Sequence, residues 1–280
     1  MKFWKRFISK LLNVNEAVYY SINQKKSAVI INDVGFGQIL DGKQAIITGG
    51  TSGIGLAIAQ KMVECGAQVT IVGRNPEKTK KVAEETNCRY LLLDLTDTNE
   101  LIKSISDYIA DKKIDILVNS AGILDKEKWL EKTPEGFDSV INTNLKAAYF
   151  MSQTIAKHMI KHNIQGHILN VSSSSSMRPS WGPYQLSKRA LNGMTLGFAQ
   201  KLAPHGITVN ALAPGVTMTP MASNFVEDTE NLAYYNPLRR AETPEEIANL
   251  AVFLASNLGT SIVGDTVMIT GGSGILSDIY

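Results

Sequence analysis

Short runs of apolar residues alternate along the chain with longer stretches whose apolar residues recur at helical spacing. Apolar runs of strand length that alternate with helices are typical of parallel strands joined by crossover helices. The pattern therefore predicts one doubly wound α/β domain, with helices on both faces of a parallel sheet of about seven strands. The expected strands lie near residues 44–48, 67–72, 89–93, 114–119, 166–172, 206–213 and 265–270.

The first expected strand runs into a glycine-rich turn, Thr48-Gly49-Gly50-Thr51-Ser52-Gly53-Ile54-Gly55, and a helical pattern follows it. Such a turn lets backbone amides approach a diphosphate, and the N-terminus of the helix adds a favourable dipole. We expect Gly49, Gly53 and Gly55 to provide the tight turn, the room for the phosphates and the close packing of helix on strand. The alternative is a glycine-rich loop that binds no ligand.

Tyr184 and Lys188 stand four residues apart, downstream of the serine run from Ser172 to Ser176. In a helix this spacing places both side chains on one face. A nearby ammonium favours phenolate, so we expect Lys188 to lower the pKa of Tyr184 from its usual value of about 10 toward neutrality. Such a phenol can exchange a proton with a carbonyl or alcohol oxygen that a serine hydroxyl holds. Taken alone, such pairs also occur by chance on solvated helix faces.

Together these motifs resemble those of the short-chain dehydrogenase/reductase family, over roughly residues 41–280. The family's glycine pattern is met by Thr48 through Gly55, and its Asn-Asn-Ala-Gly motif appears as Asn119-Ser120-Ala121-Gly122. Ser120 departs from the family's asparagine but keeps a side chain that can form hydrogen bonds. The resemblance, which includes 3-oxoacyl-carrier-protein reductases, implies a Rossmann-type fold and hydride transfer between a nicotinamide and a ketone or secondary alcohol.

The resemblance also implies a proton relay through a water held by Asn144. Thr133 and Pro134 predict the N-cap and first residue of a helix, which places Asn144 well inside that helix. Asparagine is a mediocre helix former, so an interior position suggests a function. The expected catalytic set is Ser173, Tyr184, Lys188 and Asn144.

The serine is the least secure member of this set. Ser173 precedes Tyr184 by eleven residues, a shorter spacing than the family usually has. Ser174 is the next alternative and Ser172 the third, because a run of serines permits a shift of register.

The end of the second expected strand bears on the choice of dinucleotide. NAD-binding members of the family carry an acidic residue there, whereas this chain has Gly73 followed by Arg74. A guanidinium suits a 2′-phosphate in charge and geometry, so we predict NADP(H) rather than NAD(H). The alternative is a solvated arginine at a strand end.

Two further cofactor contacts follow from the resemblance. Asp94 matches the position that accepts from the adenine amino group, and Thr219 matches the threonine that holds the nicotinamide amide. The full expected cofactor-binding set is Thr48, Gly49, Thr51, Ser52, Gly53, Ile54, Gly55, Arg74, Asp94, Leu95, Asn119, Ala121, Gly122, Tyr184, Lys188, Pro214, Gly215, Val216, Thr217 and Thr219.

The bulk composition excludes some classes of function. A net charge of +2 with 19% charged residues predicts no nucleic-acid partner. Cys65 and Cys88 are too few for a disulfide framework and lack the spacing of metal ligands, which fits a reduced, cytoplasmic setting. His158 and His162 share a helical face, but lysines flank them and we expect no metal site.

Residues 1–40 form an extension that the family usually lacks. Within residues 1–13, apolar side chains fall on one helical stripe and basic ones on the other side. We expect this basic amphipathic helix to pack on the core or on a neighbouring subunit; the alternative is peripheral contact with an anionic membrane. Neither a signal peptide nor a membrane-spanning segment is expected. By resemblance, we expect a homodimer or homotetramer.

The sequence thus predicts an NADP(H)-dependent oxidoreductase that interconverts a small-molecule ketone and a secondary alcohol. Two alternatives stay open: a regulatory or redox-sensing protein that binds the dinucleotide with little catalysis, and an epimerase or dehydratase. The substrate is not determined. Residues 218–240 are expected to form a lid over the site, in which Met221, Phe225, Leu232, Tyr234 and Tyr235 either line an apolar pocket or pack against the body.

Overall fold

The computed structural model describes residues 36–125, 127–223, 237–238 and 240–273. The basic helix expected within residues 1–13 lies outside the described residues. So do Phe225, Leu232, Tyr234 and Tyr235 of the expected lid. The described residues begin at Phe36, and Leu40 is already fully buried in the core. The domain boundary expected at residue 41 stays a prediction.

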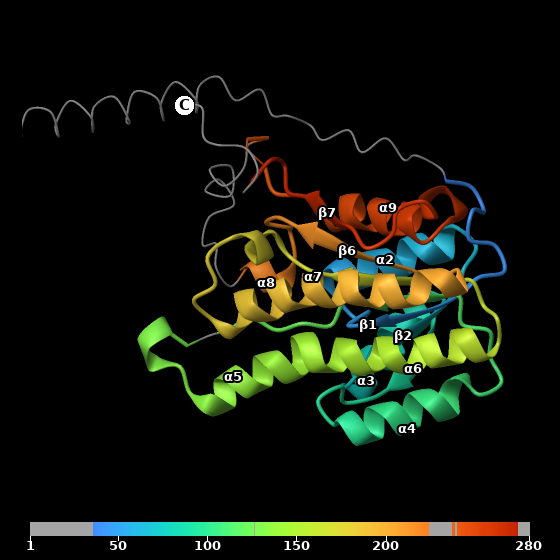
Figure 1. Ribbon diagram of the computed structural model, residues 1–280, viewed down its shortest axis with the longest axis horizontal. Coiled ribbons are helices and arrows are strands. Elements are labelled where there is room, and N and C mark those ends of the chain that lie inside the picture. Colours follow the sequence, from blue (N-terminus) through green and yellow to red (C-terminus); the bar gives the residue numbers. More distant parts are fainter. Residues whose placement is uncertain (1–35, 126, 224–236, 239, 274–280) are drawn as a thin grey trace, which may run out of the picture. The chain divides into compact units, whose positions relative to one another are not determined.

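The described residues form a sheet of seven parallel strands in the order β3-β2-β1-β4-β5-β6-β7, with helices around it (Figure 1). Every expected strand is present, so the doubly wound α/β prediction is confirmed. The strands are β1 (Gln44–Thr48), β2 (Gln68–Gly73), β3 (Arg89–Leu92), β4 (Ile116–Asn119), β5 (His167–Val171), β6 (Thr208–Pro214) and β7 (Thr266–Ile269).

Alternate residues of the central strands enter two separate hydrophobic layers. In β1, Ala45 and Ile47 belong to one buried cluster, whereas Ile46 belongs to the other. This alternation follows from the two-residue period of a strand, and it is why central strands read as continuous apolar runs. The first layer lies under α2 (Gly53–Glu64), α3 (Pro76–Glu85) and α9 (Pro244–Leu254); the second lies under α4 (Thr98–Ile109), α6 (Ala147–Lys161) and α7 (Pro183–Leu202).

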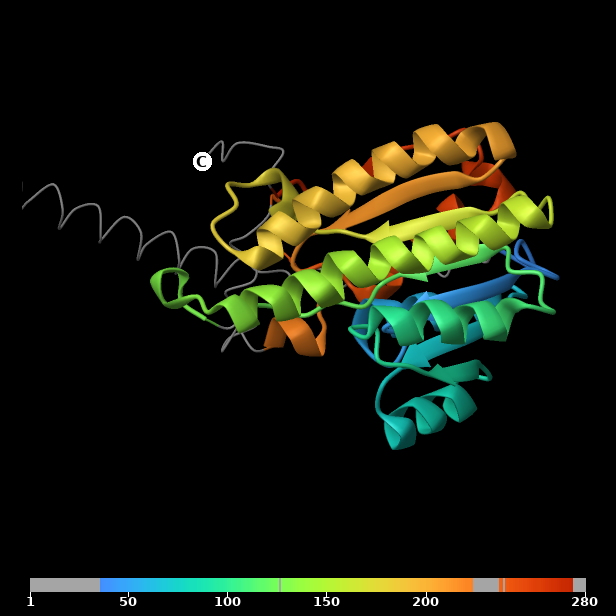
Figure 2. The same ribbon diagram turned by 60° about the horizontal axis from the view of Figure 1, so that its bottom comes forward.

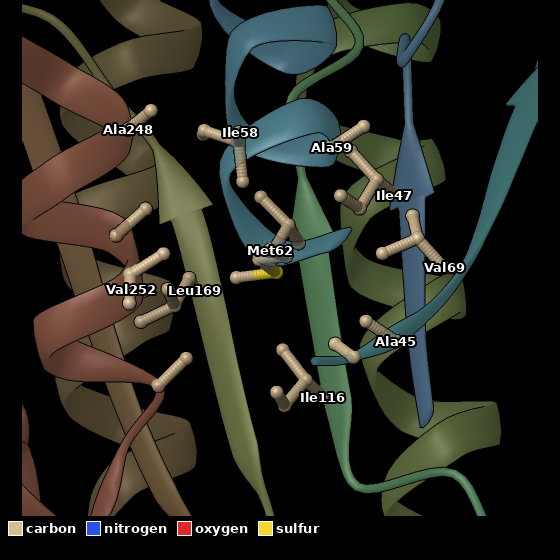
Figure 3. Packing of buried hydrophobic residues seen from close by; sticks show 14 of the residues in the cluster. Ala45, Ile47, Ile58, Ala59, Met62, Val69, Ile116, Leu169, Ala248 and Val252 are labelled. Carbon is tan, nitrogen blue, oxygen red and sulfur yellow. The ribbon is translucent and has the colours of Figure 1, made fainter. Parts of the chain in front are cut away.

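Close packing of α2 holds the glycine-rich turn in place. Figure 3 shows Ile58 and Met62 of α2 directed between the sheet and the α9 residues Ala248 and Val252. Both α2 side chains are fully buried. Because α2 is fixed along its length by this layer, its first turn is fixed against the end of β1.

Two helices begin at a threonine that is followed by a proline, and the first of these starts was predicted. Thr133 is the N-cap of α5 (Pro134–Ile141), and its hydroxyl accepts from the amide of Gly136 at 3.0 Å. Thr243 begins α9 with a capping box in which Glu246 is the reciprocal partner. These caps satisfy amides that the helix itself leaves without an acceptor.

The amino edge of the sheet carries a buried histidine whose titration should affect stability. His167 Nδ1 lies 2.8 Å from Thr208 Oγ1. Burial lowers the pKa of His167 to about 4, the charge of Lys43 acts in the same direction, and Asp115 opposes them. Because the folded pKa is below the unfolded one, stability is complete above the unfolded pKa and is lost as the pH falls toward the folded pKa.

Acidification from about pH 7 to about pH 4.5 is therefore expected to remove about 2 kcal/mol of unfolding free energy through His167 alone. Urea denaturation of the parent chain and of His167→Gln at the two pH values measures this share, because carboxylates other than Asp115 contribute equally to both proteins. Identical losses of stability in parent and variant would contradict it.

Within the described parts of the chain, no helix combines the length and the apolar character that crossing a membrane requires.

Candidate active site

A cavity of about 570 Å³ lies at the carboxyl edge of the sheet, lined by segments that follow β1, β4, β5 and β6. β1 and β4 are neighbours in the sheet, and the strand order reverses between them. Open α/β sheets bind their ligands at this kind of switch point.

Two glycines of the turn after β1 are required by close backbone contacts. Gly49 has a φ of +68°, and a Cβ at this position would lie 2.8 Å from the Cα of Ala121. A Cβ on Gly55 would lie 2.4 Å from the carbonyl oxygen of Gly49. The first turn of α2 therefore approaches the end of β1 more closely than a larger residue permits.

The N-terminus of α2 opens into the cavity, where Ser52, Gly53 and Ile54 are lining residues. Among the described residues, its first turn contains no acidic side chain, and its N-cap Ser52 provides no side-chain hydrogen bond. In contrast, α3, α4 and α9 each have a capping side chain and an acidic residue in the first turn. Uncapped amides at the positive end of the helix dipole fit the diphosphate of a dinucleotide.

Tyr184 and Lys188 lie near the start of α7, and both line the same cavity. The Lys188 ammonium nitrogen is 5.8 Å from the centre of the Tyr184 ring and donates to the carbonyl oxygen of Val171 at 2.7 Å. The phenol forms a hydrogen bond with the side chain of Ser173, which follows β5. The structure thus brings the predicted tyrosine, lysine and serine together beside the glycine turn.

Burial shifts the pKa values of both Tyr184 and Lys188. Although Tyr184 as a whole is only partly buried, its phenol lies deep among protein atoms. Burial raises the pKa of Tyr184 above its usual value, and the hydrogen bond with Ser173 acts in the opposite direction. Burial also lowers the pKa of Lys188 to about 8. The expected lowering of the tyrosine pKa is therefore wrong for this structure, because desolvation of the phenolate outweighs the hydrogen bond with Ser173.

The serine run divides into side chains with different partners. Ser173 faces Tyr184 and lines the cavity. The hydroxyl of Ser172 is directed to α7, where it lies 2.5 Å from Asn192 Oδ1. Ser174 is buried and lies outside the cavity lining. Of the serines left open by the sequence, the geometry favours Ser173.

Asn144 lies in a π-helical turn, Asn142–Lys146, which joins α5 to α6 in one continuous helix (Figure 2). Its Oδ1 accepts from the amide of Ile123 at 2.8 Å, and its Nδ2 donates to the carbonyl of Ile123 at 3.0 Å. A Cβ on Gly122 would lie 3.5 Å from Asn144 Oδ1 and 3.6 Å from Lys188 Nζ. Asn144 therefore lies directly behind the cavity wall, near Lys188.

Thr48 and Asn119, which were expected to bind the cofactor, are buried and lie outside the cavity lining. Thr48 Oγ1 accepts from the amides of Ser120 at 3.1 Å and Ala121 at 3.2 Å. Thr48 therefore ties the turn after β1 to the turn after β4, and shapes the cavity without lining it.

Asn119 belongs to a buried set of hydrogen bonds, the polar ladder, which consists of Asn119, Ser152, Asn170 and Thr195. Asn119 Nδ2 donates to Ser152 Oγ and to Asn170 Oδ1, both at 2.8 Å. Asn170 Nδ2 donates to Thr195 Oγ1 at 2.9 Å. The polar ladder joins β4, β5, α6 and α7 immediately behind the site.

The residues expected to bind the adenosine half lie at the carboxyl ends of β2 and β3, outside the cavity lining. Arg74 is exposed directly after β2. Asp94 accepts from the amide of Thr96 at 2.9 Å and from its hydroxyl at 2.8 Å, and these bonds lower the pKa of Asp94. A Cβ on Gly73 would lie 2.4 Å from Thr79 Oγ1, so no acidic side chain fits there without a local shift.

Among the described residues, no group of three or more His, Cys, Asp or Glu side chains is placed to hold a metal ion. His158 Nε2 lies 2.8 Å from the carbonyl oxygen of Lys112, which gives it a structural partner.

Comparison with known proteins places this geometry in a family. The family model described as enoyl-(acyl carrier protein) reductase matches residues 49–273. A 3-oxoacyl-[acyl-carrier-protein] reductase of Aquifex aeolicus is 35% identical over 243 residues, which cover 83% of this chain and 98% of that protein. The chain belongs to the short-chain dehydrogenase/reductase family. It is therefore an oxidoreductase that acts on CH–OH or C=O groups with a nicotinamide dinucleotide.

Other members of the short-chain dehydrogenase/reductase family at similar identity have different names. A 3alpha-hydroxysteroid dehydrogenase of Mediterraneibacter gnavus is 35% identical and covers 84% of this chain and 98% of that protein. A gluconate 5-dehydrogenase from Burkholderia cenocepacia, solved with NADP and tartrate, has a TM-score of 0.78 and 32% identity, covering 83% of this chain and 95% of that one. Relatives at 32–35% identity thus include proteins named for acyl, steroid and sugar-acid substrates.

Most of the residues that the sequence predicted for this short-chain dehydrogenase/reductase do line the cavity. The cavity has further lining residues, and most of them are neighbours of motif residues, such as Gln185 beside Tyr184. The predicted lining residues are Gly49, Thr51, Ser52, Gly53, Ile54, Gly55, Ala121, Gly122, Ser173, Tyr184, Lys188, Pro214, Gly215, Val216, Thr217 and Thr219. The additional ones are Ser120, Leu124, Val171, Ser175, Gln185, Pro220 and Ala222, together with Ser172 and Met221, which the sequence had left open as alternatives.

Proposed function

We propose that this short-chain dehydrogenase/reductase uses NADP(H) to interconvert a ketone and a secondary alcohol, with Tyr184 as the proton donor and acceptor. One observation carries the proposal. The Tyr184 phenol, hydrogen-bonded to Ser173 and near Lys188, lines the same cavity as the glycine turn.

The roles of the side chains follow from their chemistry. Ser173 and Tyr184 hold the substrate oxygen with their hydroxyl groups. The bound nicotinamide supplies or accepts the hydride. Tyr184 gives its phenolic proton to the oxygen during reduction, and its raised pKa keeps that proton in place at neutral pH. Lys188 lies near the Tyr184 ring, where its ammonium stabilises the phenolate left by the transfer. Asn144, behind the cavity wall near Lys188, holds a relay water.

The choice of dinucleotide rests on the end of β2. Gly73 leaves no room for the carboxylate that would bind ribose hydroxyls, and the exposed Arg74 follows it. A guanidinium binds a phosphate through paired hydrogen bonds. The arrangement therefore supports NADP(H) over NAD(H).

Arg74→Ala is expected to raise the KM for NADPH about tenfold and to leave the KM for NADH nearly unchanged, because an exposed charge-assisted contact is lost. Initial rates with each dinucleotide measure the effect. Arg89→Ala is the matched control, since Arg89 is an exposed arginine at the amino end of β3. A similar KM change for both dinucleotides would contradict the assignment.

The experiment that tests the proposed function is NADPH oxidation by the purified protein against a panel of ketones, with identification of the alcohol produced. Turnover of any member supports the oxidoreductase. Tight NADPH binding without turnover on the whole panel would favour the alternative, a dinucleotide-binding regulatory or sensor protein. Assembly into a homodimer or homotetramer stays a prediction.

A further inference from the structure

We propose that the substrate carries its carbonyl on a large apolar group, which lies across a set of exposed apolar side chains at the mouth of the cavity. This inference rests on the proposed function. It concerns the class of substrate, and it excludes small polyhydroxy acids as preferred substrates. The set, called here the apolar rim, consists of Trp129, Leu130, Met177, Trp181, Met218 and Met221.

The charge of the cavity argues against an acidic sugar. Among the described lining residues, the sole charged side chain is Lys188. It is buried and already donates to the carbonyl oxygen of Val171. Nearby, Lys132 is paired with Asp125. A buried carboxylate without a cationic partner is strongly unfavourable, so the cavity is poorly suited to a sugar acid.

The apolar rim belongs to segments that continue directly from the cavity wall. Leu124 lines the cavity, and the ion pair of Asp125 with Lys132 closes the loop that carries Trp129 and Leu130. Because Asp125 directly follows a lining residue, this loop starts and ends near the cavity.

The other rim residues flank motif residues. Met177 ends the short helix that follows Ser173, and Trp181 precedes Tyr184 by three residues. Met221 lines the cavity itself, and Met218 lies between the lining residues Thr217 and Thr219. Figures 1 and 2 show the loop before α5, the loop before α7 and α8 (Pro220–Ser223) gathered at the same end of the molecule.

The side chains of the apolar rim are more exposed than is usual for large apolar residues. They are between 39% and 84% exposed, and two of them are tryptophans, which are usually well buried. Exposed apolar groups on segments that gather at one end of a cavity are typical of a binding surface. Here the apolar rim adjoins the proposed reacting group, so a substrate whose carbonyl reaches Tyr184 places its remainder on the rim.

A chain-length series tests the inference on the intact protein. With NADPH, kcat/KM is expected to rise on the order of 100-fold from a four-carbon to a twelve-carbon 3-oxoacyl thioester. Each of the eight added methylenes then contributes about 1.8-fold, less than the about fourfold of full burial, because the rim covers a chain on one side only. A fused-ring ketone tests whether a ring occupies the same surface as a chain. 5-Oxogluconate should be the poorest substrate.

Variants of the apolar rim supply an independent readout. Trp181→Ala and Trp129→Ala are expected to lower kcat/KM for the twelve-carbon thioester about tenfold, and to affect the four-carbon one much less. Leu258→Ala is the control, because Leu258 is equally exposed but adjoins the amino edge of the sheet. Circular dichroism melting checks that the variants are folded.

Each outcome decides the matter. Turnover that is independent of chain length, preference for 5-oxogluconate, or rim variants that match Leu258→Ala would overturn the apolar class and leave the oxidoreductase intact. A changed oligomer mass with an unchanged chain-length series would assign the rim to subunit contacts instead, and would overturn it too. No turnover with any substrate, despite NADPH binding, would overturn the proposed function as well.

Discussion

Tyr184→Phe is expected to lower kcat for ketone reduction by about 1000-fold and to leave the Kd for NADPH nearly unchanged. The substitution removes the phenolic oxygen that gives its proton to the substrate, while the ring that forms part of the cavity wall stays. Single-turnover oxidation of NADPH, monitored by its absorbance, measures the chemical step, and fluorescence titration measures Kd.

Tyr149→Phe is the matched control for this prediction. Tyr149 lies on α6 and is partly exposed, in edge contact with the rings of Phe150 and Phe198. Removal of the Tyr149 hydroxyl should leave kcat at the parent value. If Tyr184→Phe kept more than a tenth of the parent kcat, Tyr184 could not be the proton donor.

Gly55→Ala is expected to weaken NADPH binding by about 100-fold. The added Cβ would lie 2.4 Å from the carbonyl oxygen of Gly49, a backbone atom that cannot rotate out of the way as a side chain can. Relief of the contact requires α2 to move away from β1, and this displaces the amides that face the cavity. Fluorescence titration with NADPH gives the affinity, and thermal melting gives the stability.

Gly193→Ala isolates the steric part of that effect. Gly193 lies inside α7, and an added Cβ there has no neighbour within 4 Å among the described atoms. Its replacement should keep the NADPH affinity and raise the unfolding free energy by about 0.5–1 kcal/mol, since alanine is the better helix former. Equal affinities of the two alanine variants would show that the close approach of α2 is not needed for binding.

The fold was predictable from the sequence because its signals are local. Each central strand of the parallel sheet is buried on both faces and so appears as a short apolar run, as in Ala45 to Ile47. The helix start at Thr133 was equally predictable, because a capping side chain acts within three residues of its own position.

The details of the site were less predictable because they depend on contacts between distant segments. The π-helical turn around Asn144 follows from its bonds with Ile123 and has no marker in its own residues. The raised pKa of Tyr184 depends on the burial of its phenol by segments distant in the sequence, which line the same cavity. Likewise, Asn119 is part of a familiar motif, but only its partners in β5 and α6 reveal that it braces the cavity from behind.

The polar ladder joins the central strands to the helices behind the cavity and is independent of the loops at its mouth. It joins β4, β5, α6 and α7 without using a residue from the loops that carry the apolar rim. Changes in these loops therefore leave the buried hydrogen bonds behind the cavity in place. A single scaffold of this design can diversify into enzymes for chemically unrelated ketones by small, independent steps.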